Sequence, residues 1–125
     1  MVSEEKMRAA MQAYIDGFER ADLDALVGLY AEDATVEDPV GSPPKVGRAE
    51  IEAFYAGALQ TGAKLTLSAP IRASHGNSAA MAFEVALNYE GHDIVISAID
   101  VMTFNDEGKY TSMKAYWGPA DMRPA

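Results

Sequence analysis

Apolar residues in the first half of the chain recur with the spacing of α-helices. They predict a helix from an N-cap at Ser3 to about Arg20, a short second helix capped by Asp22, and a third helix over residues 48–59. Residues 34–40, "ATVEDPV", are expected to form a brief strand before a loop that leads to the third helix. The inward faces of the three helices are expected to carry Met7, Met11, Tyr14, Ile15 and Phe18, then Leu23, Leu26, Val27 and Tyr30, and then Ile51, Phe54, Tyr55 and Leu59.

After Gly62 the period of the apolar positions changes to two, which is the period of β-strands. Turns at Glu90–Gly91 and in "NDEG" at 105–108 separate the last three strands. Three helices followed by a strongly curved, mixed or antiparallel sheet predict one α+β domain over 1–125, a cone with an apolar interior. The expected strands are 63–68, 70–75, 78–90, 93–105 and 109–118. The expected inward residues of the sheet include Met81, Phe83, Val85, Leu87 and Tyr89, and Met113, Ala115 and Trp117.

The strand around "VISAIDVMTF", residues 95–104, contains one residue that its apolar pattern does not explain. An ionised carboxylate in such a strand is very costly unless it is paired or its pKa shifts until it is neutral. Asp100 is therefore either a structural acid, paired with Arg72 or another cation or bonded to backbone, or a protonated acid that donates a hydrogen bond. The residues that share its face are Ile94, Ile96, Ala98, Met102 and Phe104.

The opposite face of this strand is apolar as well, because it carries Val95, Ile99 and Val101. The helices can cover only one face of the sheet. A second subunit is expected on the other face, so we predict a homodimer.

Composition removes several classes of function. A net charge of −9 with scattered basic residues argues against binding to nucleic acid or to anionic membranes. Without cysteine there is no disulfide, thiolate nucleophile or zinc–thiolate site. The N-terminus "MVSEEKMRAA" is acidic where a signal peptide would be basic, and no long apolar segment follows it, so we expect a soluble, cytoplasmic protein.

Three polar groups are aimed into the expected cone. Asp100 is the first, and Asp38 is the second, because the alternation in "TVEDPV" turns it inward. Asp38 is either the opener of an Asp-Pro turn or an ionised general base at the cavity mouth. Tyr14 is either a core aromatic or a phenol that points at a ligand oxygen, with Tyr30 and Tyr55 able to polarise it through a hydrogen-bond chain.

Other kinds of site have little support. His75 and His92 lie in or beside turns without metal-ligand spacing, so we expect both to be solvated and predict no metal site. No Ser or Cys stands in a nucleophile motif, and "VGSPPKVG" at 40–47 lacks the spacing and the ending of a phosphate loop.

Five stretches together resemble the bacterial Δ5-3-ketosteroid isomerases of the nuclear transport factor 2-like superfamily, also described as cystatin-like rolls. The resemblance covers about Met7 to Trp117, with the same order and close spacing. The stretches are "AYI" around Tyr14, "LYAEDATVEDPVGSPP" around Asp38, "FYAGAL" at Phe54–Tyr55, "IDVMTF" around Asp100 and "MKAYWG" around Trp117.

The resemblance implies a homodimer that needs no cofactor and isomerises a small apolar steroid. It implies Asp38 as the general base, with Tyr14 and a protonated Asp100 as the oxyanion hole, a pairing already established for that family. It also implies that Tyr30 and Tyr55 support Tyr14 in a network of three tyrosines. The residues that it implies for the pocket lining are Phe54, Met81, Phe83, Val85, Ala115 and Trp117.

The surroundings of the two acids differ in the direction that this chemistry needs. Asp100 lies deep in an apolar strand, whereas Asp38 lies at a strand end beside a loop that admits water, so its pKa is expected to stay near the ordinary value. Two alternatives remain: a non-enzymatic ligand-binding or dimerisation module, and another enzyme on the same scaffold, such as a polyketide cyclase or epoxide hydrolase. The module has no need for two inward acids, and the other enzymes need His or Asn/Arg/Asp groupings that this sequence does not assemble.

Overall fold

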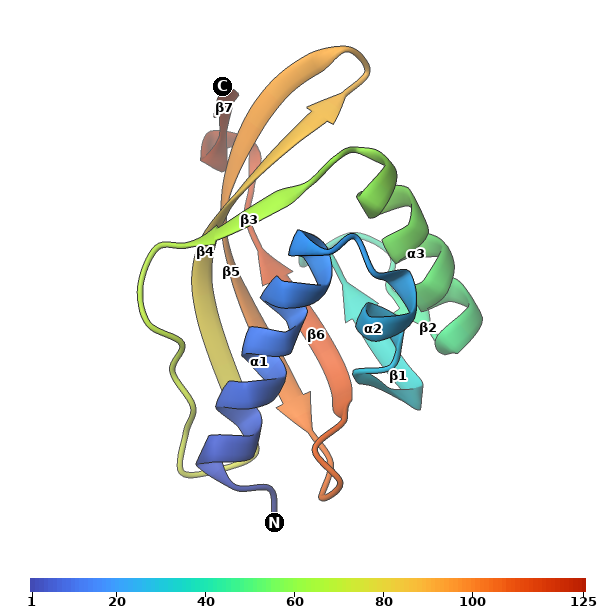
Figure 1. Cartoon of the computed structure of the whole chain (residues 1–125), viewed down its shortest axis with the longest axis vertical. Coiled ribbons are helices and arrows are strands. Elements are labelled where there is room, and N and C mark those ends of the chain that lie inside the picture. The colour runs from blue at the N-terminus through green and yellow to red at the C-terminus, as the bar shows by residue number, and fades with distance from the viewer.

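Three helices pack on one face of a curved sheet in the computed structural model, which describes all 125 residues (Figure 1). The side chain of Ser3 accepts a hydrogen bond from the backbone N–H of Lys6, and that of Asp22 accepts one from the backbone N–H of Ala25. Both predicted helix caps are therefore confirmed. The helices are α1 (Glu4–Glu19), α2 (Leu23–Val27) and α3 (Arg48–Gln60).

The sheet is mixed, with the strand order β2-β1-β6-β5-β4-β3. Strands β1 and β6 run parallel, and all other neighbours are antiparallel. A two-residue turn with positive φ at Glu90 (51°) and Gly91 (84°) joins β4 to β5, as the sequence predicts for this hairpin. The strands are β1 (Tyr30–Glu37), β2 (Lys45–Val46), β3 (Lys64–Leu67), β4 (Ser78–Tyr89), β5 (His92–Phe104), β6 (Tyr110–Tyr116) and β7 (Met122–Pro124).

Three local predictions are wrong. Tyr30 is the first residue of β1 and not part of the second helix, because that helix ends at Val27 and the chain straightens after Gly28. Residues 70–75 form no strand and make only an isolated bridge to β4, since Pro70 has no N–H to donate to a ladder. The short strands β2 and β7 were not predicted, because two or three residues are too few to show a period.

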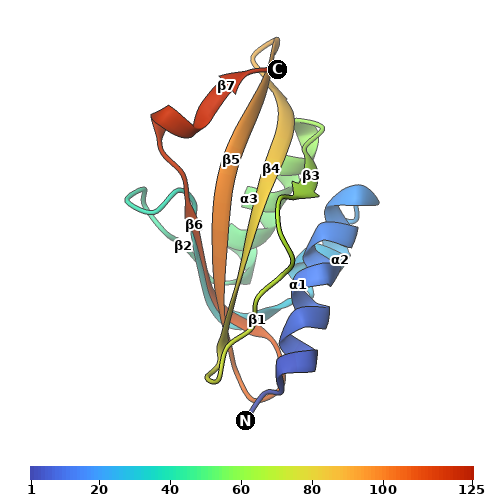
Figure 2. The ribbon, with the colours of Figure 1, turned by 90° about the vertical axis from the view of Figure 1, so that its left-hand side faces the viewer.

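The sheet has a covered face and an open face. Figure 2 shows α1 and α2 on one side of β4 and β5, whereas the short 3-10 helix Pro119–Asp121, between β6 and β7, lies on the other side. Along β5 the inward positions Ile96 to Phe104 are at most 7% exposed, whereas the outward Ile99 is 48% exposed. Asp100 is among the inward residues, so the predicted register of this strand is confirmed.

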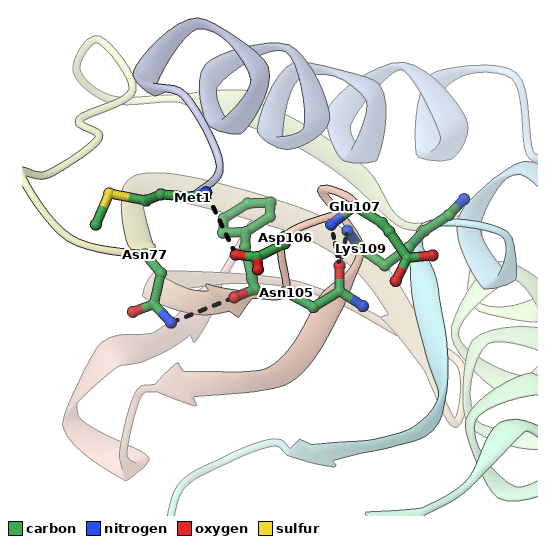
Figure 3. A network of polar contacts seen from close by, with 7 residues as sticks. Met1, Asn77, Asn105, Asp106, Glu107 and Lys109 are labelled. Carbon is green, nitrogen blue, oxygen red and sulfur yellow. Dashed lines mark hydrogen bonds and ion pairs between the residues drawn. The ribbon is translucent and has the colours of Figure 1, made fainter.

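The end of the molecule that carries the N-terminus is closed by polar contacts (Figure 3). The side-chain oxygen of Asn105 accepts hydrogen bonds from the backbone N–H groups of Glu107 and Lys109, which fixes the β5–β6 turn. The terminal ammonium group of Met1 lies 3.6 Å from the carboxylate of Asp106. None of these residues lines the cavity between helices and sheet. None of the helices combines the length and the apolarity that crossing a lipid bilayer requires.

Candidate active site

The helices and the inward face of the sheet enclose a cavity of about 600 Å³, its mouth included. Sixteen residues line it, and thirteen of them are hydrophobic. Only Asp38, Thr61 and Asp100 are not. Such a cavity suits an apolar ligand that is held in place by a few polar groups.

Five of the six residues expected to line a pocket do line this cavity. The exception is Met81, which is 1% exposed and lies outside the lining. Met81 pairs with Asp100 in the β4–β5 register, so it is packed into the core at the inner end of the cavity. The five lining residues are Phe54, Phe83, Val85, Ala115 and Trp117.

A chain of three tyrosine hydroxyls ends at the cavity. Tyr14 of α1 lies 3.1 Å from Tyr55 of α3, measured between hydroxyl oxygens, and Tyr55 lies 2.5 Å from Tyr30 at the start of β1. Burial raises the pKa of each hydroxyl well above the ordinary value, so all three keep their protons at neutral pH. A hydrogen bond from Tyr55 lowers the pKa of Tyr14, and one from Tyr30 lowers that of Tyr55. When Tyr30 donates to Tyr55 and Tyr55 donates to Tyr14, the proton of Tyr14 is free for a ligand in the cavity.

Asp100 is buried without any partner. It is 1% exposed, and neither carboxyl oxygen makes a hydrogen bond. Arg72, the cation considered as its partner, is exposed and does not contact it, so the interpretation of Asp100 as a paired structural acid is wrong. Burial raises the pKa of this carboxyl well above the ordinary value, and the nearby charge of Asp38 raises it further. These surroundings favour the neutral carboxylic acid, which has a proton to donate.

Asp38 follows β1 directly and has one strong donor. Its Oδ1 accepts a hydrogen bond of 2.8 Å from Nε1 of Trp117, and the backbone N–H of Val40 donates to the carbonyl of Ala115, also at 2.8 Å. These contacts fix the segment after β1 against the end of β6. Burial raises the pKa of Asp38, and the indole hydrogen bond opposes that rise. The expectation of an ordinary pKa is therefore corrected, because the carboxyl is more enclosed than a strand end next to a loop suggested.

The two acids thus differ in whether a hydrogen-bond donor stabilises their ionised form. Asp38 has a donor that stabilises its ionised form, whereas Asp100 has none and is more deeply buried. Asp38, whose ionised form has a hydrogen-bond donor, Asp100, which has none, and the phenol of Tyr14 face one largely apolar cavity. This arrangement can remove a proton next to a ligand carbonyl while two donors hold the carbonyl oxygen.

Sequence reasoning missed two features of the site. The Trp117–Asp38 hydrogen bond joins residues 79 positions apart, and no local sequence pattern predicts such a contact. Thr61 lines the cavity from the turn after α3, where the apolar period gives no information on inward or outward direction. Both histidines are exposed, as predicted, and no group of three or more His, Asp or Glu residues is placed to hold a metal ion.

Comparisons with known proteins agree on the fold, and the relatives are named as two kinds of enzyme, a steroid isomerase and epoxide hydrolases. The sequence pattern of the SnoaL-like domain matches residues 11–113. The chain is 44% identical over 118 residues to the Steroid Delta-isomerase of Nocardioides simplex, covering 94% of both chains. It is 29% identical over 107 residues to the Epoxide hydrolase LasB of Streptomyces lasalocidi, which is 80% of this chain but 37% of that protein.

A solved structure of SalBIII, described as an epoxide hydrolase/cyclase-like enzyme with a role in pyran ring formation in the polyether salinomycin, superposes with a TM-score of 0.90. The match covers 97% of each chain at 28% sequence identity. The predicted class, three helices on a curved mixed sheet, is therefore confirmed.

The unpartnered carboxyl of Asp100 predicts how stability depends on pH. The folded chain keeps the proton of Asp100 above the pH at which the unfolded chain loses it, near 3.9. The folded state therefore binds more protons there, and the contribution of Asp100 to the free energy of unfolding falls as pH rises. Asp100→Asn removes this contribution. Its stability relative to the wild type should increase from about pH 4 upward, by at most about 1.4 kcal/mol per pH unit.

Urea unfolding at a series of pH values measures the difference. Asp33→Asn, on an exposed position of β1, is the matched control and should follow the wild-type curve. A difference between Asp100→Asn and wild type that stays constant from pH 4 to pH 8 would show that Asp100 is ionised in the folded protein.

Proposed function

Because the chain belongs to the SnoaL-like domain family and, within it, to the steroid Δ-isomerases, we propose that it moves the double bond of 3-oxo-Δ5-steroids to the conjugated Δ4 position. The observation that carries the proposal is the polar content of the cavity. Asp38 has a donor for its charge, Asp100 has none, and one tyrosine hydroxyl ends a hydrogen-bond chain, and these three groups face a space that is otherwise apolar except for Thr61.

Tyr14 and Asp100 form the oxyanion hole of this reaction. Burial raises the pKa of both groups well above the ordinary value, so both are suited to donate to the 3-oxo oxygen while the fused rings lie against the apolar lining. As the substrate loses a proton, negative charge develops on that oxygen and the two hydrogen bonds strengthen. Each such donor contributes on the order of 10²–10³ in rate.

Asp38 is the base that moves the proton. Its carboxylate takes a proton from carbon 4, and the electron pair left behind forms the dienolate. The protonated Asp38 then returns the proton to carbon 6, so the carbon 5–6 double bond becomes a carbon 4–5 double bond and no atom is gained or lost. Burial raises the pKa of Asp38, but the Trp117 hydrogen bond opposes that rise, which favours the ionised base, and it holds the carboxylate in place. A positioned base contributes about 10²–10⁴ in rate.

The alternatives explain less of the site. A carrier of apolar ligands would gain nothing from burying the carboxyl of Asp100 without a partner, which is unfavourable for folding. The relatives named as epoxide hydrolases are less similar than the steroid isomerase, at 29% and 28% against 44% identity.

A direct assay tests the proposed reaction. Mixing the purified protein with a Δ5-3-oxosteroid should give the ultraviolet absorbance of a conjugated enone. Asp38→Asn should lower kcat by about 10²–10⁴ because it removes the base, and binding of a phenolic steroid should stay nearly intact. Glu32→Gln, an exposed change on β1, is the control and should keep full activity. The proposal fails if the wild type forms no enone, and the base assignment fails if Asp38→Asn turns over normally.

The indole hydrogen bond predicts a change in the pH–rate profile. Trp117→Phe keeps an aromatic wall but removes the donor that opposes the rise in the pKa of Asp38. The acid limb of kcat/KM should therefore move to higher pH, because a larger fraction of Asp38 stays protonated at a given pH. Tyr89→Phe, on the exposed end of the β4–β5 hairpin, should leave the profile in place. An unmoved acid limb in Trp117→Phe would remove the indole from any role in controlling Asp38.

We propose that the protein is a homodimer formed through the open face of the sheet. Ile99 of β5 and Tyr116 of β6 are register partners on that face, and both are 48% exposed. Burying such large side chains between two copies is favourable. Light scattering should give twice the mass of the chain, and Ile99→Asp should give a monomer. Val46→Asp, an exposed change on the edge strand β2, should leave the protein dimeric. A wild type that is monomeric at all concentrations would overturn this proposal.

A further inference from the structure

Thr61 and Asp100 lie at opposite ends of the cavity. Asp100 is in register with Met81 of β4. The backbone carbonyl of Thr61 accepts a hydrogen bond of 3.0 Å from the N–H of Asn88, seven residues further along the same strand. Seven residues of a straight strand span at most about 23 Å and the curved β4 spans less, so Thr61 lies towards the hairpin end of the strand, away from Asp100 (Figure 1).

A long, rigid ligand that is held at Asp100 therefore extends towards Thr61. Phe83, Val85 and Leu87 fill the successive inward positions of β4 between the two ends, and all three line the cavity. These side chains offer apolar contact but no hydrogen bond. Because the other two polar lining residues act at the reacting end, Thr61 is the one polar side chain left for the far end of the ligand.

The hydroxyl proton of Thr61 is already committed. Its Oγ1 donates a hydrogen bond of 2.6 Å to the carbonyl of Ala58, a residue that also lines the cavity. A threonine hydroxyl has one proton and two lone pairs, so Oγ1 can accept a further hydrogen bond but cannot donate one while it holds Ala58. A ligand hydroxyl would satisfy this oxygen. A ligand ketone would place two acceptors against each other.

We propose that Thr61 is a specificity-determining residue that favours steroids with a hydroxyl group, rather than an oxo group, at the end of the ring system opposite the 3-oxo group. The inference rests on the proposed isomerase function, because that function places the 3-oxo group at Asp100. It concerns substrate preference and not the chemical step, since Thr61 lies far from the reacting carbons.

The test compares two Δ5-3-oxosteroids that differ only in a 17β-hydroxyl or a 17-oxo group. Thr61→Val removes the acceptor and keeps the shape of the side chain, whereas Thr61→Ser keeps the acceptor. In Thr61→Val the ratio of kcat/KM for the hydroxy over the oxo substrate should fall by about threefold to tenfold, the range of one neutral hydrogen bond. The change should appear in KM, with kcat for both substrates within about twofold of wild type. Thr61→Ser should keep the wild-type ratio within about twofold.

Thr66→Val is the matched control, because Thr66 lies on an exposed position of β3 outside the cavity lining and should leave the ratio unchanged. A merely structural role of Thr61 at the end of α3 would lower activity towards both substrates alike and leave the ratio as it is. An unchanged kcat/KM ratio in Thr61→Val therefore overturns the proposal. A fall of the ratio in Thr61→Ser as large as that in Thr61→Val overturns it as well. If Thr61→Val does not fold, Thr61→Ala removes the same oxygen without adding a methyl group.

A binding measurement separates this inference from the proposed reaction. Trp117 is the only tryptophan of the chain and lines the cavity, so quenching of its fluorescence reports binding without turnover. The 17β-hydroxy Δ4-3-oxosteroid should bind wild type more tightly than its 17-oxo counterpart, and Thr61→Val should reduce this preference by the same factor as in the kinetic test. Absence of isomerisation with the binding preference intact would overturn the reaction and leave the role of Thr61 standing. Equal binding of both steroids to wild type would overturn the role of Thr61 whether or not the reaction occurs.

Discussion

A carboxyl group without a hydrogen-bond partner, at the centre of an apolar sheet, is the constraint on which the site depends. Such a group destabilises the fold unless it stays neutral, and the surroundings of Asp100 favour the neutral form. The inward neighbours of Asp100 on β5 are apolar, its cross-strand partners Met81 and Ala115 carry no charge, and the one nearby acid disfavours its ionisation. What is unfavourable for stability is useful to a reaction that needs a proton donor at neutral pH.

The remaining parts of the site follow from where the fold brings donors together. The tyrosine chain draws one residue from α1, one from β1 and one from α3, so the hydroxyl at the cavity depends on the packing of all three elements. Asp38 depends on β6 in the same way, through Trp117 and through the backbone contact of Val40 with Ala115. Because each group is held by a second element, the geometry is set before a ligand arrives, which is what electrostatic catalysis requires.

The sequence predicts the parts of this structure that depend on period and misses those that depend on contact across space. Alternation along β5 is enough to turn Asp100 inward, and helix caps at Ser3 and Asp22 are local signals that the structure confirms. Tyr30 was assigned to a helix because its spacing suits an inward helical position as well as the inward start of a strand. The hydrogen bond that Asp38 accepts could not be predicted, since its donor is a tryptophan 79 residues away.

The geometry also separates reaction from recognition. The proposed base and oxyanion-hole groups lie around the place where Asp100 of β5 pairs with Ala115 of β6, whereas the far end of the cavity is formed by the β4–β5 hairpin and the turn after α3. Contacts far from the reacting centre contribute to substrate affinity in ground state and transition state alike, so they alter preference without altering the chemical step. A change at Thr61 therefore leaves Asp38 and Asp100 undisturbed. On such a scaffold, the proposed role of Thr61 assigns substrate preference to a turn residue that is separate from the buried acid, which the fold accommodates at a cost in stability.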